Sequence, residues 1–592
     1  MSDGGMQRGA VGRSGARRLP GVLLVVALTA CSAIGGRTGS DGAAASPEVP
    51  PRMDSAVGNY LAGRYAQHEH DYPAAAQYFR RALAAHPDDL DLENKTFVFD
   101  TTAGRMGEAV LLAGRINHAD PNAALPNLVL AVARLKARDY AASAAFAEKL
   151  PQQGVQRFAV PLLLAWAKAG AGEDSAAAHA LAALRAVQGF APIADFHEGL
   201  IADWQGRTED AEAAYQRVRQ VSAHGNWRIV EALGSLDERT DRRPQALALY
   251  RDFIAENPDS DLVAAAQARL AAASPPPPRV AGPSAGAAEG LFDLATLLNQ
   301  SETTDLALIY GRLALDLEPD FPLAKLLVAD ILETQNQPAE ALALDRSVAP
   351  GSPYAWIARL RAAGDLVALD RADEAIAELR RMAAERPHET APLVELGDLL
   401  RDKKRYGEAI AAYDEAVTRI GAAVGPRDWG LFYSRGVAYE RAGDWPRAEA
   451  DLERALQFQP DQPAVLNYLG YSWIDKGSHL DEALRMIQRA VALRPEDGYI
   501  VDSLGWAFYR LGNYAQATLQ LEHAVELRPD DPTINDHLGD AYWQSGRRGE
   551  ARSQWRRALQ FGPETDEMRT IEAKLDRGLV RPAPIAKAAQ GG

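Results

Sequence analysis

The residues of this chain that could carry out chemistry do not form a known catalytic pattern. The sequence contains no H-E-x-x-H, no glycine-rich phosphate loop and no G-x-S-x-G. The closest pair among its 11 histidines is His68-Glu69-His70, at the end of an expected helix. A metal site would need further ligands, so we interpret this pair as a solvated turn. Carboxylates are abundant, but they follow the helix-surface pattern with Arg and Lys partners. The sequence therefore predicts a protein that is not an enzyme and needs no metal or cofactor.

The stretch from Tyr499 to Pro529 shows which elements must position the other residues. A turn at Gly512-Asn513 separates two runs of helical spacing, and Pro529 ends the second run. The order of residues resembles the tetratricopeptide repeat (TPR) signature, W-x2-L-G-x2-Y, then A-x3-F, then P. Val501, Phe508 and Leu521 stand in its Trp, Tyr and Phe positions. The two expected helix faces are formed by Val501, Leu504, Gly505 and Phe508, and by Tyr514, Ala517, Leu521 and Ala524.

Similar segments recur along the whole chain. Expected repeat starts lie near residues 56, 90, 124, 158, 192 and 227, and again near 288, 322, 356, 390, 429, 463, 498 and 532. The resemblance implies an all-α superhelical solenoid, in which each helix pair buries its faces against its neighbours. We expect six and a half repeats over 56–273, a proline-rich linker over 274–287, eight repeats plus a capping helix over 288–577, and a disordered tail over 578–592.

The composition supports a helical protein with protein partners. Ala and Leu dominate and only 7% of the residues are aromatic, which favours helix over strand. The formal net charge of −16 is too acidic for a general nucleic-acid binder.

Residues 1–30 predict a signal peptide. Four arginines precede a short apolar stretch, residues 21–27, which is too short to span a bilayer. It ends in Leu28-Thr29-Ala30-Cys31, with Cys31 the only cysteine in the chain. This ending resembles the bacterial lipobox, whose cysteine becomes the first mature residue and carries several acyl chains. An ordinary signal peptide with a chance cysteine is the alternative. With Ser32 next, the resemblance implies an outer-membrane lipoprotein on the periplasmic face of a Gram-negative bacterium. Residues 31–55 predict a flexible tether.

The TPR resemblance also places a set of aromatic and polar residues in a groove. In that fold, the first helix of each repeat lines a concave surface. Aromatic side chains there provide contact area, and Asp or Asn can hold the main chain of an extended peptide. The same side chains could instead pack between neighbouring repeats, and both interpretations stay open. The candidate groove residues are Asn467, Tyr471, Tyr499, Asp502, Trp506, Tyr509, Asp536, Asp540 and Trp543.

The carboxyl-terminal part resembles a narrower group, the proteobacterial TPR lipoproteins. The marks are N-x-L-G-Y at 467–471, D-S-L-G-W at 502–506 and H-L-G-D at 537–540. The resemblance implies an outer-membrane adaptor that presents substrates, such as cell-wall hydrolases, to a periplasmic carboxyl-terminal processing protease. One alternative is a scaffold in an exopolysaccharide export or outer-membrane assembly complex. A more remote alternative is an enzyme that uses the repeats as a platform.

Overall fold

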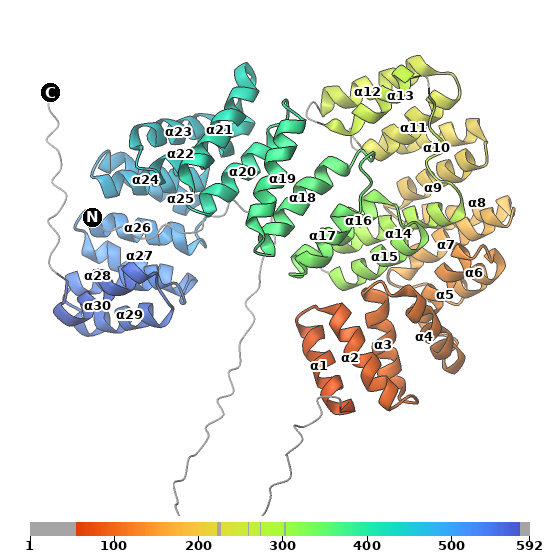
Figure 1. Ribbon diagram of the computed structural model, residues 1–592, viewed down its shortest axis with the longest axis horizontal. Helices are drawn as coiled ribbons and strands as arrows, with labels where there is room; N and C mark the ends of the chain where they lie inside the picture. Colours follow the sequence, from red (N-terminus) through yellow and green to blue (C-terminus); the bar gives the residue numbers. More distant parts are fainter. Residues whose placement is uncertain (1–54, 222–225, 258–259, 273, 301–302, 580–592) are drawn as a thin grey trace, which may run out of the picture. The chain divides into compact units, whose positions relative to one another are not determined.

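The computed structural model describes residues 55–221, 226–257, 260–272, 274–300 and 303–579. Every regular element in these residues is a helix (Figure 1). Within the same ranges, no helix combines the length and the apolar character needed to cross a bilayer. The predicted signal peptide, Cys31 and the tether up to residue 54 lie outside the described residues, as does the tail from residue 580.

Before the proline segment, the described helices form six pairs followed by a short 3-10 turn and one single helix. Their bounds are α1 Ala56–His68, α2 Tyr72–Ala85, α3 Leu90–Thr102, α4 Met106–Ala119, α5 Ala124–Lys136, α6 Tyr140–Ala147, α7 Gln156–Gly170, α8 Asp174–Arg185, α9 Ala191–Trp204, α10 Thr208–Val221, α11 Trp227–Arg239, α12 Arg243–Glu256, η1 Asp261–Val263 and α13 Ala264–Ala272.

After the proline segment, the described helices form eight pairs and one closing helix. Their bounds are α14 Pro283–Asn299, α15 Thr304–Leu317, α16 Pro322–Thr334, α17 Pro338–Arg346, α18 Ala355–Ala368, α19 Ala372–Glu385, α20 Ala391–Asp402, α21 Tyr406–Ile420, η2 Gly421–Ala423, η3 Pro426–Asp428, α22 Trp429–Arg441, α23 Trp445–Phe458, α24 Pro463–Lys476, α25 Leu480–Leu493, α26 Gly498–Arg510, α27 Tyr514–Leu527, α28 Pro532–Gln544, α29 Arg548–Gln560 and α30 Thr565–Arg577. The first helices begin at or beside the expected repeat starts, except α14, which begins earlier, at Pro283.

The pair α26–α27 shows why the sequence folds in this way. After α26, Gly512 takes a φ of +79°, a backbone region open to glycine, and Asn513 then caps α27. The Asn513 side chain accepts a hydrogen bond from the Gln516 amide at 3.2 Å. The two helices approach closely because Gly505 has no side chain: a Cβ there would lie 2.5 Å from Leu521 Cγ. The expected all-α fold of stacked helix pairs is thus confirmed, with small residues at the helix contacts.

The chain divides into two compact units at a different place from the expected one. The first unit ends at Glu378 and the second begins at Leu379, inside α19. The proline segment, expected to separate two arrays, lies within the first unit. It is extended, as four consecutive prolines require. It is also packed: Val280 is buried in the core, and Arg239 Nη1 donates to the Pro277 carbonyl at 3.1 Å.

The reason for this difference is that the helices after the proline segment fold back on the helices before it. α14 contacts α5, α7 and α9, and α15 contacts α3 and α5 (Figure 1). These are all first helices of their pairs. One hydrophobic core therefore runs through the unit from Phe97 to Ala324 and includes Trp166 and Leu291.

Candidate partner-binding surface

The nine predicted groove residues all come from three neighbouring first helices of the second unit, α24, α26 and α28. α24 contacts α26, and α26 contacts α28. Equivalent positions on neighbouring repeats face the same side of a solenoid. We call the surface formed by the fifth and ninth residues of these helices the inner surface. Its members are Asn467, Asp502 and Asp536 at the fifth position, and Tyr471, Trp506 and Asp540 at the ninth.

The closing helix α30 covers the inner surface at α28. Lys574 Nζ lies 2.9 and 2.7 Å from the two Asp536 carboxylate oxygens and 2.9 Å from Asp540 Oδ2. Trp555 Nε1 donates to the other Asp540 oxygen at 3.0 Å. Burial raises the pKa of Asp540 to about 6, although Lys574 opposes it. Burial alone would lower the pKa of Lys574, but Asp540 and Asp536 hold it above its usual value. Both aspartates are therefore occupied by the chain's own lysine.

At α26, the inner surface is occupied by a histidine from the next repeat. His537 Nδ1 lies 3.0 Å from both carboxylate oxygens of Asp502. The His537 ring stacks on Trp506, with 4.1 Å between ring centroids, and Trp506 stacks on Tyr509 at 4.8 Å. Tyr509 is only 4% exposed. Packing between repeats therefore accounts for Asp502 and Tyr509 and for most of the Trp506 ring.

Trp543 and Tyr499 also make contacts within the chain. The Trp543 ring lies 5.3 Å from the Trp555 ring, and its Nε1 donates to the Leu579 carbonyl at 3.1 Å. Tyr499 is exposed on one side, and the Arg528 guanidinium lies 5.2 Å from its ring. For Trp543, these contacts favour packing over a free ligand-binding face.

The inner-surface residues Asn467 and Tyr471 differ from these. Among the described residues, no lysine or histidine of another repeat pairs with them. Asn467 is buried, and its Oδ1 has no hydrogen-bond partner among the described residues. Tyr471, one turn further along α24, is half-buried. Burial, reinforced by the carboxylates of Asp502 and Asp475, raises its pKa. The Trp506 indole N–H, on the neighbouring helix, likewise has no partner within the described part of the chain. An acceptor, a phenol and an indole donor therefore lie on adjacent helices.

Three residues that complete this surface were not among the predicted ones. His537 falls inside the H-L-G-D mark, Lys574 inside the expected capping helix, and Trp555 at a buried position of α29. The sequence could have indicated His537, because this residue is the first of the H-L-G-D motif. Helical spacing does not indicate that a side chain will reach a carboxylate on another repeat, as both His537 and Lys574 do.

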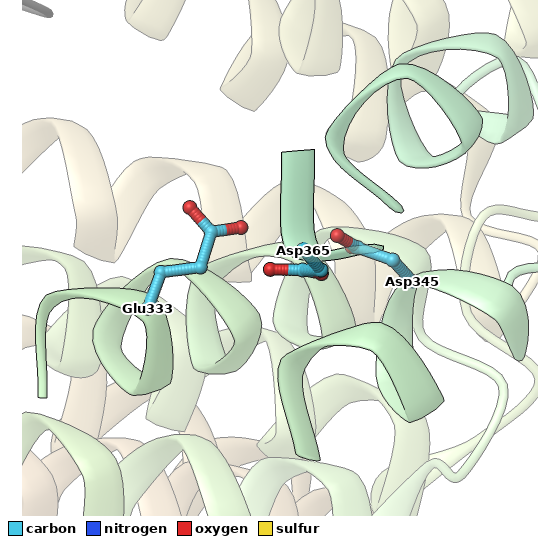
Figure 2. A group of neighbouring side chains, drawn as sticks. All are labelled: Glu333, Asp345 and Asp365. Atoms are coloured by element: carbon cyan, nitrogen blue, oxygen red, sulfur yellow. The ribbon is translucent and has the colours of Figure 1, made fainter. Parts of the chain in front are cut away.

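An acidic cluster in the first unit is a second place where a ligand could be sought. Carboxylate oxygens of Glu333, Asp345 and Asp365 lie within 4.8 Å of one another (Figure 2). Arg361 already supplies a cation there, with Nη2 2.8 Å from Glu333 Oε1 and Nε 3.4 Å from Asp345 Oδ2. Burial raises the pKa of Asp345 to about 7, against the effect of Arg361. We interpret the cluster as an ion network in which Asp345 readily holds a proton.

The pair His68 and His70 lies at a pocket in the first unit. Both side chains are exposed, and with Arg64, Tyr72 and Asp305 they line a cavity of about 290 Å³. The Tyr72 hydroxyl donates to Asp305 Oδ1 at 2.6 Å and lies 2.8 Å from His70 Nδ1. Because the single hydroxyl proton goes to Asp305, His70 Nδ1 must be the donor in the second bond. His70 and Tyr72 thus link the first helix pair to Asp305 of α15.

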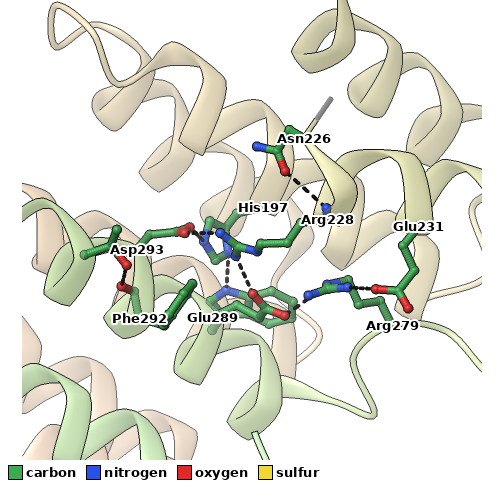
Figure 3. Close-up of polar contacts among 10 residues, drawn as sticks. His197, Asn226, Arg228, Glu231, Arg279, Glu289, Phe292 and Asp293 are labelled. Atoms are coloured by element: carbon green, nitrogen blue, oxygen red, sulfur yellow. Dashed lines mark hydrogen bonds and ion pairs between the residues drawn. The ribbon is translucent and has the colours of Figure 1, made fainter. Parts of the chain in front are cut away.

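A buried ion network joins α14 to α11 and to the proline segment. Arg228 Nη1 lies 2.5 Å from Asp293 Oδ1, and Nη2 bonds Glu289 (Figure 3). Arg279, from the proline segment, links Glu289 at 3.0 Å to Glu231 at 2.5 Å. Burial would raise the pKa of Asp293, but Arg228 holds it below its usual value.

A buried histidine extends this network to the core. Trp166 Nε1 donates to His197 Nδ1 at 2.9 Å, so the imidazole proton resides on Nε2, 3.4 Å from Asp293 Oδ2 (Figure 3). The first helices α5, α7 and α9 of this unit are therefore in contact with the chain's own α14.

Comparison of the sequence with models of known protein families finds repeats where the structure has helix pairs in the second half of the chain. Residues 360–424, 419–463 and 433–498 match a model described as tetratricopeptide repeat, and residues 505–546 match one described as TPR repeat. These residues form tetratricopeptide repeats. Such repeats act as protein–protein interaction scaffolds, which supports protein partners for this chain.

Individual relatives cover only part of the chain. A TPR repeat-containing protein of Pseudomonas aeruginosa is 31% identical over 188 residues, which are 32% of this chain and 31% of that protein. The BBSome complex member BBS4 of Bos taurus is 29% identical over 113 residues, or 19% of this chain and 20% of its own length. The chain thus spans less than a third of the length of these curated relatives. The solved APC/C hetero-tetramer Cut9-Hcn1 covers 89% of this chain, and 97% of its own chain is covered. Its sequence identity to this chain is 14% and its TM-score is 0.37.

Proposed function

We propose that this protein is a non-enzymatic scaffold that binds protein segments on the inner surface of its second unit. The observation that carries this proposal is the contrast between neighbouring repeats. Asp502, Asp536 and Asp540 have partners within the chain, whereas Asn467 Oδ1 and the Trp506 indole N–H have none among the described residues. An unpaired acceptor and donor beside a half-buried tyrosine match the main-chain amides and the side chain of an extended peptide.

The contacts of α14 and α15 in the first unit support the same location. α14 lies against the first helices α5, α7 and α9, and α15 lies against α3 and α5, so the chain itself covers these helices. We therefore place the binding surface on the second unit, and the first unit would act as a folded support.

We further propose that the scaffold is lipid-anchored at Cys31 on the periplasmic face of the outer membrane and recruits a protease with its cell-wall-hydrolase substrates. The support is the lipobox-like ending of the signal sequence and the motifs at 467–471, 502–506 and 537–540. Two partners held on one scaffold meet at a raised effective concentration, so that cleavage is accelerated without any catalytic residue on the scaffold.

Crosslinking in cells tests the binding surface and the partner together. A photoreactive residue replaces Tyr471 or Trp506 in the full chain, and a matched control replaces Leu519, which is 55% exposed on the second helix α27. We expect partners captured at 471 and 506 but not at 519. A protease or cell-wall hydrolase among them supports the adaptor role, and a polymer secretion channel supports the export alternative. Identical products from all three positions would contradict the proposed surface.

A labelling experiment tests the anchor separately. Cells supplied with an alkyne-bearing palmitate should label the wild-type protein, and Cys31→Ala should abolish the label. The variant should also leave the membrane fraction. Labelling that survives in Cys31→Ala would exclude this site of lipidation. Incubation of the purified protein with peptidoglycan, without a protease, tests the remote enzymatic alternative, and we expect no product.

A further inference from the structure

We propose that α30 is a displaceable internal occupant of the inner surface, and that its Lys574 stands where a lysine or arginine of a bound partner segment would lie. The proposal rests on the protein-binding role above and adds the chemistry of the ligand. It assigns Asp536 and Asp540 as a subsite for a basic side chain.

The position of Lys574 is the first argument. Asp536 and Asp540 occupy the same positions of α28 that Asn467 and Tyr471 occupy on α24. A ligand extending along the inner surface from α24 would reach α26 and then this pair. At Asp536 and Asp540 the ligand would meet the Lys574 ammonium group of the chain itself, which lies within 2.9 Å of both carboxylates. The last repeat thus shows one kind of group that the surface accepts.

The second argument is the light attachment of α30. Ile571 is the only residue of this helix that is fully buried, whereas the second helices α25, α27 and α29 each bury at least three. Most charged residues of α30, such as Asp566, Arg569 and Glu572, are exposed. Apolar burial supplies most of the free energy of helix docking. α30 contributes only Ile571 and the partly buried Leu575 to the core, so the ion pairs of Lys574 supply a large share of its attachment.

The third argument is the burial of the Asp536 and Asp540 carboxylates beneath α30. The Asp540 side chain is 6% exposed and the Asp536 side chain 18% exposed. Trp555 fixes Asp540 from within the repeat and does not move with α30. Removal of the Lys574 ammonium group with α30 still in place would leave a buried carboxylate pair without this counter-charge, which is strongly unfavourable. A partner segment that displaces α30 and covers the pair again must therefore supply a cation, which a lysine or arginine provides.

A chemical-rescue experiment on the purified full chain tests the subsite. Lys574→Ala removes the ammonium group, and propylammonium chloride is then added. We expect it to raise the melting temperature of Lys574→Ala by about 3 °C or more, relative to sodium chloride at the same ionic strength. Arg577→Ala, which changes an exposed charge on the same helix, is the matched control and should gain nothing. Equal effects of propylammonium on both variants would overturn the subsite.

A binding experiment tests displacement. The probe is a fluorescein-labelled peptide with the sequence of residues 564–579, in its natural form and with alanine in place of its lysine. We expect the natural peptide to bind Lys574→Ala at least tenfold more tightly than the wild-type chain. It should also bind at least tenfold more tightly than the alanine peptide. Adding Asp536→Asn and Asp540→Asn should abolish the difference between peptides. Equal binding of the two peptides, or no binding to Lys574→Ala, would overturn the displaceable occupant. Neither experiment contains the cellular partner, so their failure is distinct from a failed crosslinking experiment.

Discussion

Gly286 of α14 lies directly against Trp166 of α7: a Cβ at this glycine would come within 2.2 Å of the indole ring. Trp166 is fully buried and cannot move aside without disturbing the core. Gly286→Ala should therefore destabilise the first unit by roughly 2 kcal/mol or more through overpacking. Denaturant unfolding monitored by circular dichroism measures the change.

Gly114 provides the control for this substitution. It lies on an exposed face of α4, and a Cβ there would meet no atom within 4 Å. Gly114→Ala should be neutral or stabilise the protein by up to about 1 kcal/mol, because alanine loses less backbone entropy in a helix. Equal effects of the two substitutions would show that α14 is not seated against Trp166.

Arg228→Met tests the buried ion network. The substitution leaves Glu289 and Asp293 without this cation in a buried setting, and we expect a loss of about 3–5 kcal/mol. Arg251→Met, at an exposed position of α12, should change stability by less than about 0.5 kcal/mol. A similar small loss for Arg228→Met would mean that the network does not hold α14.

Ala517→Asp tests the helix contact in the α26–α27 repeat. Ala517 is 0% exposed, so the new carboxylate would be buried without a partner, and we expect a loss of several kcal/mol. Ala515→Asp, two residues earlier on an exposed face, is the matched control and should be close to neutral. Unfolding curves that coincide for the two variants would contradict the assigned helix faces.

His537 gives the second unit a stability that depends on pH. Burial would lower the pKa of His537, but Asp502 outweighs it, and the folded pKa is raised above the ordinary value. The resulting stabilisation is fully present below the unfolded pKa, near 6.5, and is lost as the pH rises through the folded pKa. The unfolding midpoint should therefore fall more steeply from pH 6 to pH 9 in the wild type than in His537→Gln. His388→Gln, at an exposed position, should keep the wild-type slope.

Asp345 produces a pH dependence in the first unit at lower pH. Its folded pKa of about 7 exceeds the unfolded value near 4. The stabilisation from its proton is present below about pH 4 and is lost as the pH rises toward 7. Asp345→Asn removes this loss, so its stability relative to the wild type should increase from pH 4 to pH 8 by more than about 1.4 kcal/mol. A constant difference across this range, as expected for the exposed Asp88→Asn, would contradict the raised pKa.

The helix pairs were predictable because their signals are local. Small residues such as Gly505 and Ala517, a turn glycine such as Gly512 and a terminating Pro529 recur within one repeat. These signals place the helix starts from α16 onward within one residue of the expected positions. The closing helix α30 was predicted for the same reason.

The fold-back of α14 was not predictable in this way. Its residues Glu289 and Asp293 are one turn apart and resemble any charged helix face, while their partner Arg228 lies more than 60 residues earlier. The same limit applies to the candidate site. Helical position put Asp502 and Asp540 on the inner surface, but it carried no information on His537 or Lys574 as their partners. Whether a side chain on a repeat surface is available depends on contacts between repeats, which spacing within one repeat does not contain.

The fold-back also changes how the first unit must fold. An ordinary array of helix pairs forms contacts between neighbours in sequence, so it can nucleate anywhere and grow in either direction. Here Tyr72 bonds Asp305 across 233 residues, and Arg312 bonds the Thr102 carbonyl across 210 residues. Contacts of this separation raise the contact order and slow folding, because a long loop must close before they form. During synthesis, the first six helix pairs must therefore wait for α14 and α15 before their core is complete.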